Sequence, residues 1–417
     1  MQNSKLAVSH VYKIFGSDSS AALDLLRQGR SKQDILAQTG ATVGVQDASF
    51  AVEEGEIFVV MGLSGSGKST LVRMLNGLIP PTAGKILIDG EDVATADTAA
   101  LRRIRRQKIS MIFQHFALFP HWTVAENVAY GLKITGVPRD ERRKRALEVL
   151  EQVGLAPWAD SLPSDLSGGM QQRVGLARGL AADPDILLMD EPFGALDPLI
   201  RREMQMELLA LQQKLKKTII FITHDLNEAL LLGSRIAIMK DGRIVQIGTA
   251  QEIVTAPADD YVAAFVADID RGRVFTADDV SNKPVTIQLR QTSVRDALRM
   301  MEQGGANALY VMDGERVAGV VTYQDLAACE MDTTTPPPTL QGALITDFPT
   351  ADTTTSLSDL YGAAGSGLPI AVTDERERLL AVVEPSDVLN HLSGEAAAEL
   401  AAIPATNGKE QLHVQPR

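Results

Sequence analysis

The chain has 417 residues, of which 45% are hydrophobic, a net charge of −13 and a single cysteine, Cys329. This length allows two or three domains with a core each, and the hydrophobic content excludes a chain that is disordered throughout. One cysteine excludes an intrachain disulfide and is typical of a reducing compartment. Residues 271–417 hold 11 Lys and Arg against 20 Asp and Glu. This acidic balance argues against a nucleic-acid partner.

A membrane-spanning segment is not expected. No stretch approaches the roughly 18 uncharged apolar residues that a span requires. The first residues also lack the apolar core of a signal peptide. We therefore expect a protein that is soluble and cytoplasmic, or peripheral to a membrane.

The first 60 residues combine strand and helix patterns. Residues 6–15 have a weak apolar alternation that predicts a strand, and residues 43–60 return to strand patterning with an interruption at 53–56. Between them, residues 21–39 have the spacing of one or two amphipathic helices with a break near Gly29. This helical stretch, about residues 17–42, looks like an insertion into a β region.

A glycine-rich loop follows the apolar run 57–61, which predicts a buried strand, and precedes residues 71–75, which have the spacing of a helix. A triphosphate is bound mainly by main-chain N–H groups, which glycines bring close, and by the positive end of the next helix. Lys68 can reach the β- and γ-phosphates, and the Ser69 hydroxyl can ligate Mg²⁺. The residues of this loop predicted to bind a nucleoside triphosphate are Gly62, Ser64, Gly65, Ser66, Gly67, Lys68, Ser69 and Thr70.

The next stretch predicts a strand at 85–88, then a basic helix and a strand at 109–113 that ends directly before Gln114. The basic run 102–106 is interpreted as a solvated helix face rather than as a phosphate contact. Residues 124–155 have a helical pattern.

The segment 166–173 opens another helix, which is expected to extend to about Ala182. Ser167 has the residue type of an N-cap. Gly168 and Gly169 in the first turn cost helix stability, and such glycines usually let the backbone approach another group closely. We therefore expect a group to be held against this helix start.

Two further strands end in polar residues. The apolar run 186–189 is followed by Asp190 and Glu191, and the run 218–223 is followed by His224. Consecutive acids at the end of a buried strand are costly unless they meet a metal or a donor, and ligands bind at this edge of parallel sheets. These residues are therefore candidates for the nucleotide site.

In this order, the motifs resemble those of the nucleotide-binding subunit of an ATP-binding-cassette (ABC) transporter, over about residues 1–272. They are the phosphate loop at 62–69, Gln114, Leu-Ser-Gly-Gly-Met-Gln at 166–171, Ile-Leu-Leu-Met-Asp-Glu-Pro at 186–192, Ala-Leu-Asp at 195–197 and His224. The Leu-Ser-Gly-Gly-x-Gln signature separates this family from other phosphate-loop ATPases. The resemblance implies an α/β fold with a RecA-like core, an antiparallel β subdomain and a helical subdomain.

The resemblance also implies roles for the phosphate and metal ligands. Lys68 would hold the phosphates of ATP, and Ser69 would ligate Mg²⁺. Asp190 would support the ion through water. Gln114 would link the metal and the attacking water to the membrane subunit.

Three further polar residues have implied roles in turnover. Glu191 would polarise the attacking water, and His224 would contact the γ-phosphate. Asp197 would couple two ATP sites. These assignments agree with the chemistry, because phosphoryl transfer needs positioning and charge neutralisation rather than covalent help.

The family's working unit is a dimer with two ATP molecules at the interface. Ser167, Gly168 and Gly169 would face the γ-phosphate of ATP held by a second copy, with their helix N-terminus toward the anion. An aromatic residue near the first strand is expected to stack on adenine. Phe15 matches this position best, and Tyr12 is the alternative.

A closer resemblance is to the ATPases that energise uptake of glycine betaine, proline betaine, proline or choline. It is carried by the helical insertion and by residues 11–16, 44–49, 61–65 and 196–201. Residues 192–194 are Pro-Phe-Gly where this group is expected to have Ala-Phe-Ser, which bears on the solute but not on the ATP chemistry. The implied partners are a transmembrane permease and, indirectly, an extracytoplasmic solute-binding protein. The subunit would lie on the cytoplasmic face of the membrane.

The remaining residues contain an internal repeat at an offset near 62, in which residues 292–296 match 355–359 and residues 320–326 match 382–388. Each copy resembles a cystathionine-β-synthase (CBS) domain of βαββα type, and such domains pair. We expect the copies at 273–332 and 341–395, joined by a Pro- and Thr-rich linker. An acidic tail, residues 396–417, is expected to be disordered.

Asp325 and Asp387 fall where CBS domains often contact a ribose. Glu384 replaces the threonine represented by Thr322, and an acid there would repel phosphate. The pair is therefore expected to be regulatory, through an adenine nucleotide, through ionic strength or the membrane surface, or as a dimer clamp.

Two alternatives remain. The first is an importer ATPase for another small solute. The second is a soluble ATP-dependent regulator or repair ATPase without a permease. Residues 115–124, which resemble the permease-docking region of importers, favour transport, and one cysteine cannot supply the zinc-type insertions of repair members.

Overall fold

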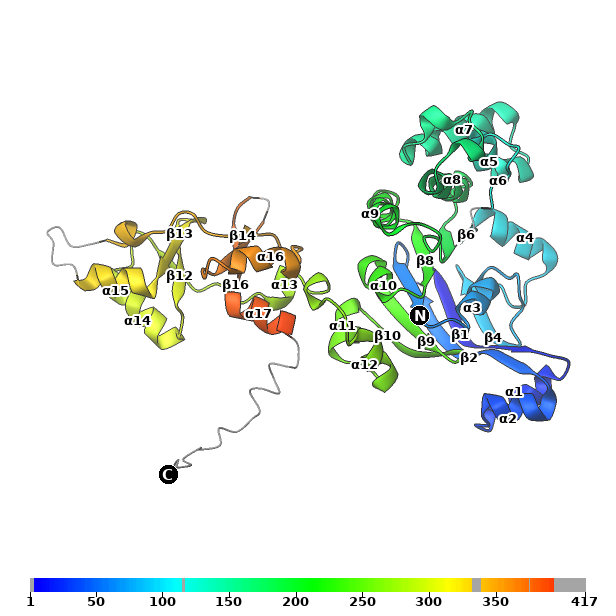
Figure 1. Cartoon of the computed structure of the whole chain (residues 1–417), viewed down its shortest axis with the longest axis horizontal. Coiled ribbons are helices and arrows are strands. Elements are labelled where there is room, and N and C mark those ends of the chain that lie inside the picture. The colour runs from blue at the N-terminus through cyan, green and yellow to red at the C-terminus, as the bar shows by residue number, and fades with distance from the viewer. Residues whose placement is uncertain (1–3, 115–116, 332–338, 375, 394–417) are drawn as a thin grey trace, which may run out of the picture. The chain divides into compact units, whose positions relative to one another are not determined.

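The structure is a computed structural model and describes residues 4–114, 117–331, 339–374 and 376–393 (Figure 1). The chain forms two compact units, Met1–Asp268 and Ile269–Arg417. The predicted acidic tail, 396–417, and residues 332–338 of the predicted linker lie outside the described residues. In the part that the structure describes, no helix is long and apolar enough to cross a membrane.

The first unit contains a six-stranded sheet in the order β10-β9-β3-β8-β7-β6. Four adjacent strands are mutually parallel, namely β3 (Ile57–Met61), β8 (Thr218–Thr223), β7 (Ile186–Asp190) and β6 (Ile109–Phe113). All residues of β3 and β8 are buried, as expected of strands with both faces covered. β9 (Arg235–Lys240) is parallel to β3, and β10 (Arg243–Gly248) pairs with β9 antiparallel.

The parallel pairing brings four strand ends to one edge of the sheet. Met61 pairs with Thr223, and Phe113 pairs with Asp190, so the registers align these ends. The strands predicted at 57–61, 109–113 and 218–223 are confirmed with their bounds. The residues that directly follow the four strands are Gly62, Gln114, Glu191 and His224.

A second, antiparallel sheet has the order β2-β1-β4-β5. Its strands are β1 (Leu6–Phe15), β2 (Thr42–Val52), β4 (Ala83–Ile88) and β5 (Glu91–Asp92). Helices α1 (Ser19–Arg27) and α2 (Lys32–Thr39) lie between β1 and β2 in the chain, with Gly29 between them at φ 81°. The predicted helical insertion and its break are confirmed.

Helix α3 (Lys68–Leu75) joins the two sheets through one hydrophobic core. Its Leu71, Met74 and Leu75 are fully buried together with Leu6 of β1 and Phe58 of β3. Full burial of such side chains contributes about 1.5–3 kcal/mol each. This core therefore fixes the start of α3, where the glycine loop ends.

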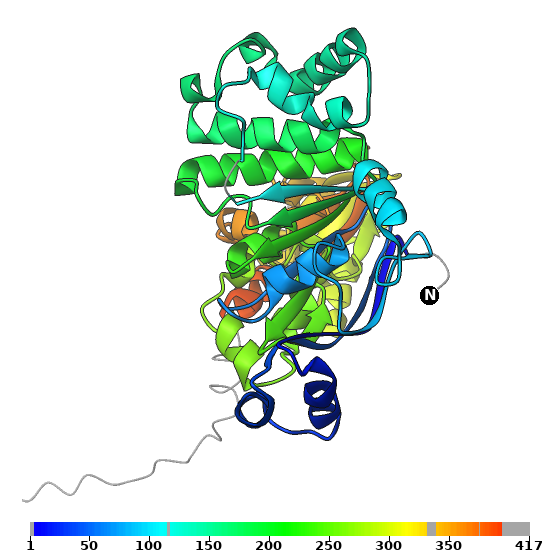
Figure 2. The same ribbon diagram turned by 90° about the vertical axis from the view of Figure 1, so that its right-hand side faces the viewer.

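A group of helices occupies one end of this unit, opposite the end that carries α1 and α2 (Figures 1 and 2). Its members are α5 (Val124–Val128), α6 (Tyr130–Ile134), α7 (Arg139–Gln152) and α8 (Gly168–Ala181). The helical pattern predicted at 124–155 is confirmed, and the structure divides it into three helices. Gly136, at φ 84°, and Pro138 separate α6 from α7, because neither favours a continuing helix.

Five further α-helices are described in this unit. They are α4 (Thr98–Gln107), α9 (Pro198–Leu215), α10 (Leu226–Leu232), α11 (Ala250–Thr255) and α12 (Asp260–Val266). Ile104 is the buried residue of α4, whereas Arg102, Arg103, Arg105 and Arg106 are exposed. The interpretation of the basic run as a solvated helix face is confirmed.

The second unit repeats one motif twice, after the short helix α13 (Ala277–Val280). The first copy comprises β11 (Thr286–Gln288), α14 (Val294–Gly304), β12 (Ala308–Asp313), β13 (Arg316–Thr322) and α15 (Tyr323–Met331). The second comprises β14 (Thr350–Ala351), α16 (Leu357–Ala364), β15 (Ile370–Thr373), β16 (Leu379–Val383) and α17 (Pro385–Ser393). In each copy the first pair of strands is parallel and the second antiparallel. The predicted βαββα repeat is confirmed.

The two copies share a small core. Tyr310 and Val320 of the first copy pack with Ala371 and Val382 of the second. The Tyr310 hydroxyl donates a hydrogen bond of 2.5 Å to the carbonyl of Pro369. Burial raises the pKa of Tyr310, so the phenol remains a neutral donor at physiological pH.

Candidate active site

The glycine loop between β3 and α3 has a conformation that requires glycine at two places. Gly62 and Gly67 have φ values of 152° and 101°. A Cβ atom at Gly62 would lie 2.2 Å from the Met239 carbonyl oxygen, and one at Gly67 would lie 2.5 Å from that of Gly44. Neither position has room for a side chain. The loop is therefore held tightly against β2 and β9.

Lys68, the first residue of α3, lies beneath this loop. Its ammonium group donates hydrogen bonds to the carbonyls of Gly62, at 2.7 Å, and Leu63, at 3.1 Å. Burial lowers the pKa of Lys68, while Glu191 and Asp190 oppose that shift. The buried Ser66 Oγ has no hydrogen-bond partner among the described residues. A buried cation and an unpaired hydroxyl in one loop suit an anionic ligand.

Two oxygen groups suited to a hard cation meet beside this loop. The Ser69 Oγ atom lies 3.4 Å from Asp190 Oδ1, at the end of β7. Burial and the neighbouring Glu191 raise the pKa of Asp190, which disfavours its charged form. A cation beside the carboxylate would stabilise that charge. No group of three or more His, Cys, Asp or Glu side chains in the described ranges could hold a metal alone. The pair fits Mg²⁺, which takes one or two protein ligands together with phosphate oxygens.

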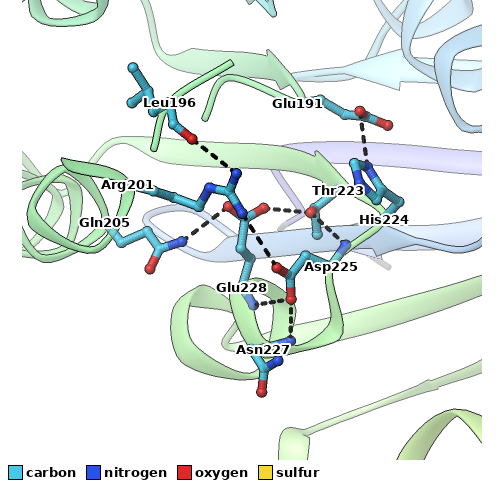
Figure 3. Close-up of polar contacts among 9 residues, drawn as sticks. All are labelled: Glu191, Leu196, Arg201, Gln205, Thr223, His224, Asp225, Asn227 and Glu228. Atoms are coloured by element: carbon cyan, nitrogen blue, oxygen red, sulfur yellow. Dashed lines mark hydrogen bonds and ion pairs between the residues drawn. The ribbon is translucent and has the colours of Figure 1, made fainter. Parts of the chain in front are cut away.

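The structure brings the other strand-end residues to the same place. His224 Nδ1 lies 3.0 Å from Glu191 Oε2 (Figure 3). Glu191 has a left-handed backbone, φ 47°, and its N–H donates to the Ile222 carbonyl. The Gln114 side chain lies against the loop that follows Glu191. A Cβ atom at Gly194 in this loop would lie 3.2 Å from Gln114 Nε2.

The signature segment lies elsewhere, at the start of α8 in the helix group (Figure 1). Ser167 is the N-cap, and its Oγ atom accepts a hydrogen bond of 3.4 Å from the Met170 N–H. Ser167 and Gly168 are exposed. A Cβ atom at Gly169 would lie 2.7 Å from Ile200 Cγ2, so a larger residue there would displace the Ile200 side chain. Asp197 caps the adjacent helix α9 through the Ile200 N–H, at 3.1 Å.

The two adenine-stacking candidates have different surroundings. Tyr12 packs into the core between β1 and the inserted helices. Phe15, at the end of β1, is 41% exposed. A Cβ atom at Gly44 would lie 2.9 Å from its ring, and the Gly44 carbonyl touches the glycine loop at Gly67. Phe15 is therefore partly exposed next to the loop, with Lys13 Nζ 5.2 Å from the centroid of its ring, whereas Tyr12 packs into the core.

The segment after Gln114, of which residues 115–116 are not described, leads to a pocket of about 330 Å³ in the helix group. Residues 119–123 are tied down by Asn127, which is fully buried. Its amide donates to the carbonyls of Phe119, Trp122 and Thr123 at 3.0–3.1 Å and accepts from the Phe119 N–H at 2.7 Å. The pocket is lined by Trp122, Thr123, Ala125, Glu126, Ala129, Lys133, Arg139, Arg142, Arg143 and Asp160.

In the second unit, the predicted regulatory residues occupy equivalent places in the two repeats. Thr322 Oγ1 donates to Asp325 Oδ2 at 2.6 Å. In the other repeat, Asp387 Oδ2 accepts a bond of 2.8 Å from the amide of Asn282. Burial and the adjacent Asp387 raise the pKa of Glu384, which stands in the place of the threonine.

Glu228 was not among the residues predicted from the sequence. It lies in α10, four residues after His224, and is 6% exposed. Its neighbours Leu226, Ala229 and Leu232 are buried. A carboxylate on the apolar face of a helix is a visible signal in the sequence, but its partners are not.

Comparisons with known proteins identify related chains. Residues 45–194 match the ABC transporter family, and residues 277–332 match the CBS domain family. The glycine betaine/carnitine transport ATP-binding protein GbuA of Listeria monocytogenes is 50% identical over 393 residues, 94% of this chain and 98% of that protein. The glycine betaine transport ATP-binding protein OpuAA of Bacillus subtilis is 49% identical and covers 94% of this chain and 93% of its own length.

Two further matches widen the comparison. The trimethylamine N-oxide transport ATP-binding protein TmoW of Pelagibacter ubique is 49% identical over 294 residues, 70% of this chain and 86% of that protein. Among solved structures, cbiO1 of Clostridium perfringens, part of the ABC transporter complex cbiONQ, is 27% identical with a TM-score of 0.52. It covers 61% of this chain and 92% of its own.

Replacement of Lys68 by alanine tests the loop directly. Because a hydrogen bond to a charged group contributes about 1.5–3 kcal/mol, we expect Lys68→Ala to weaken ATP binding roughly tenfold or more in calorimetry. Lys85→Ala, at an exposed position on β4, is the control and should bind ATP like the unmodified chain. Unchanged affinity in Lys68→Ala would contradict the assignment of this loop.

Proposed function

The chain belongs to the ABC transporter family, as an ATP-binding subunit that hydrolyses ATP, and on this premise we propose that it energises uptake of a quaternary amine osmolyte through a separate permease. The proposed solutes are the quaternary amines glycine betaine, proline betaine and choline, together with the secondary amine proline. Relatives named for glycine betaine transport support this choice, since they are 49–50% identical to this chain over 94% of its length. The observation that carries the ATPase chemistry is the meeting of Lys68, Asp190, Glu191 and His224 at one sheet edge.

We propose that the protein's own groups act by position and charge. Lys68 would exchange its two carbonyl contacts for phosphate oxygens, and Glu191 would orient and polarise the attacking water. His224, already beside the Glu191 carboxylate, would contact the γ-phosphate. When bound, Mg²⁺ would neutralise charge on the phosphate oxygens, held on the protein side by Ser69, Gln114 and Asp190.

A second copy of the chain is the proposed partner at the signature segment. Ser167 and Gly168 are exposed at the start of α8, where backbone N–H groups favour an anion. They lie in the helix group and not at the sheet edge that carries Lys68, so the anion would come from another chain. Leu199, two residues after Asp197, is 78% exposed. We propose that these residues meet the ATP and the surface of the second copy.

The pocket beside Trp122 is the proposed docking site of the permease. Lys133 Nζ lies 4.5 Å from the centroid of the Trp122 ring, so the pocket combines an apolar face with positive charge. Asn127 fixes residues 119–123 beside this pocket, and a shift of Gln114 at the nucleotide would be transmitted through this segment to the permease. This role places the subunit on the cytoplasmic face of the membrane. The extracytoplasmic solute-binding protein would act only through the permease.

The second unit is proposed to regulate the ATPase. The acid pair Glu384 and Asp387 disfavours phosphate in the second repeat, since both carboxylates are close and Glu384 is partly buried. A response to ionic strength is therefore favoured over an adenine nucleotide at that position. Thr322 and Asp325 remain the proposed nucleotide contacts of the first repeat.

The Glu191→Gln variant tests the proposed general base. We expect it to bind ATP normally but to lose at least about a hundredfold in turnover, because the amide cannot polarise water. ATP binding by calorimetry and phosphate release measure the two effects. Glu151→Gln, on the exposed side of α7, should retain full turnover. Normal hydrolysis by Glu191→Gln would remove Glu191 from this role.

Deletion of residues 273–417 tests the regulatory role. We expect the shortened chain to keep its basal ATPase rate but to lose the dependence of that rate on salt. The full-length variants Asp325→Ala and Asp387→Ala show whether these carboxylates carry the response. A salt response that survives the deletion would contradict the proposal.

Transport itself is tested by reconstitution with the neighbouring permease and binding protein. We expect ATP-driven accumulation of labelled glycine betaine or choline, and none with the Glu191→Gln subunit. Trimethylamine N-oxide is the comparison solute, because it is not a quaternary amine. Accumulation of that solute alone, or of none with ATPase activity intact, would overturn the quaternary-amine assignment.

A further inference from the structure

Glu228 is a buried carboxylate next to the candidate active site that none of the roles above uses. It lies in α10, four residues after His224, and is 6% exposed. Burial raises the pKa of Glu228, and a hydrogen bond from Thr223 opposes that shift. A buried carboxylate costs free energy unless donors satisfy it, so its partners indicate what it holds in place.

Two donors from different elements meet this carboxylate (Figure 3). Thr223 Oγ1, at the end of β8, donates to one oxygen at 2.5 Å, and Gln205 Nε2, in α9, donates to the other at 3.0 Å. All three side chains are buried, with exposed fractions of 6% or less. Glu228 therefore bridges a strand end and a helix.

The Thr223 hydroxyl extends this bridge across His224. Besides donating to Glu228, it accepts a hydrogen bond of 2.9 Å from the Asp225 N–H. The peptide unit that follows His224 is thus held by the side chain of the residue that precedes His224. Asp225 in turn caps α10, because its Oδ1 atom accepts from the N–H groups of Asn227, at 2.8 Å, and Glu228, at 3.4 Å.

Helix α9 holds the same region by a second contact. Arg201 Nη1 lies 3.8 Å from Asp225 Oδ2, and Nη2 donates to the Leu196 carbonyl at 3.0 Å. Leu196 directly precedes Asp197, the cap of α9. The start of α9 also packs against the signature segment through Ile200 and Gly169.

We propose that Glu228 is a positioning residue that joins α9 to the backbone of His224 and thereby sets the imidazole against Glu191. Glu228 does not touch the ATP site itself. A shift of the α9 start, where the second copy is proposed to dock, would reach His224 through Gln205, Glu228 and Thr223. This inference rests on the proposed role of His224 in hydrolysis.

The variant Glu228→Gln tests the bridge with little change of volume. A glutamine side chain has one acceptor and one donor group, so either Thr223 or Gln205 loses its acceptor. We expect kcat of the full-length ATPase to fall about tenfold with KM for ATP unchanged, because positioning errors act on the reacting groups. Glu151→Gln is the matched control.

The variant His224→Ala separates positioning from general destabilisation. If Glu228 acts through His224, adding Glu228→Gln to His224→Ala should cause no further loss of kcat. The exchange Gln205→Glu with Glu228→Gln restores one donor to each acceptor and should recover kcat to within about twofold of the original. This exchange keeps the test valid if Glu228→Gln alone folds poorly.

Histidine-selective NMR provides a readout that does not require turnover. The chain has six histidines, and His224→Ala assigns the signal of interest. We expect the His224 imidazole signal to shift in Glu228→Gln and to return in the exchange variant. An unmoved signal, an unchanged kcat or a loss that multiplies in the His224→Ala background would overturn the inference. If the unmodified chain failed to hydrolyse ATP, the proposed function would fail, while the NMR result would still decide this inference.

Discussion

The parallel pairing of β3, β8, β7 and β6 is the constraint on which the rest of the structure depends. Because their registers align, the residues that follow the four strands come to one edge, and these are Gly62, His224, Glu191 and Gln114. The phosphate loop follows β3, and Asp190 and Glu191 lie at the end of β7, so these parts of the site are fixed by buried strands.

The signature helix completes this arrangement from the outside. Its exposed start is held by α9 through Gly169 and Ile200, and α9 reaches back to the sheet edge through Gln205 and Glu228. Helix α9, which Asp197 caps, therefore contacts the signature segment and is linked through Glu228 to Thr223, the last residue of β8. In a dimer, α9 would contact the second copy at its start and would be linked to the nucleotide site through Glu228.

Much of this could be predicted from the sequence, for identifiable reasons. Buried strands of five or six apolar residues and a glycine loop are local signals, so β3, β6 and β8 were predicted with their bounds. The division of residues 124–155 into three helices was missed, because apolar spacing continued through Gly136 and Pro138. Glu228 was missed because its partner Gln205 lies 23 residues away in another helix, and periodicity carries no information on such a contact. The choice between Phe15 and Tyr12 likewise needed the packing of the inserted helices.

The measurement that tests this account most directly is the structure of the full-length Glu191→Gln chain with ATP and Mg²⁺, by electron cryo-microscopy. The account predicts two copies with two ATP molecules between them. Each ATP should contact Lys68 and Ser69 of one copy and Ser167 of the other, with His224 at the γ-phosphate. ATP bound away from Lys68, or enclosed by one chain without a second signature segment, would contradict it.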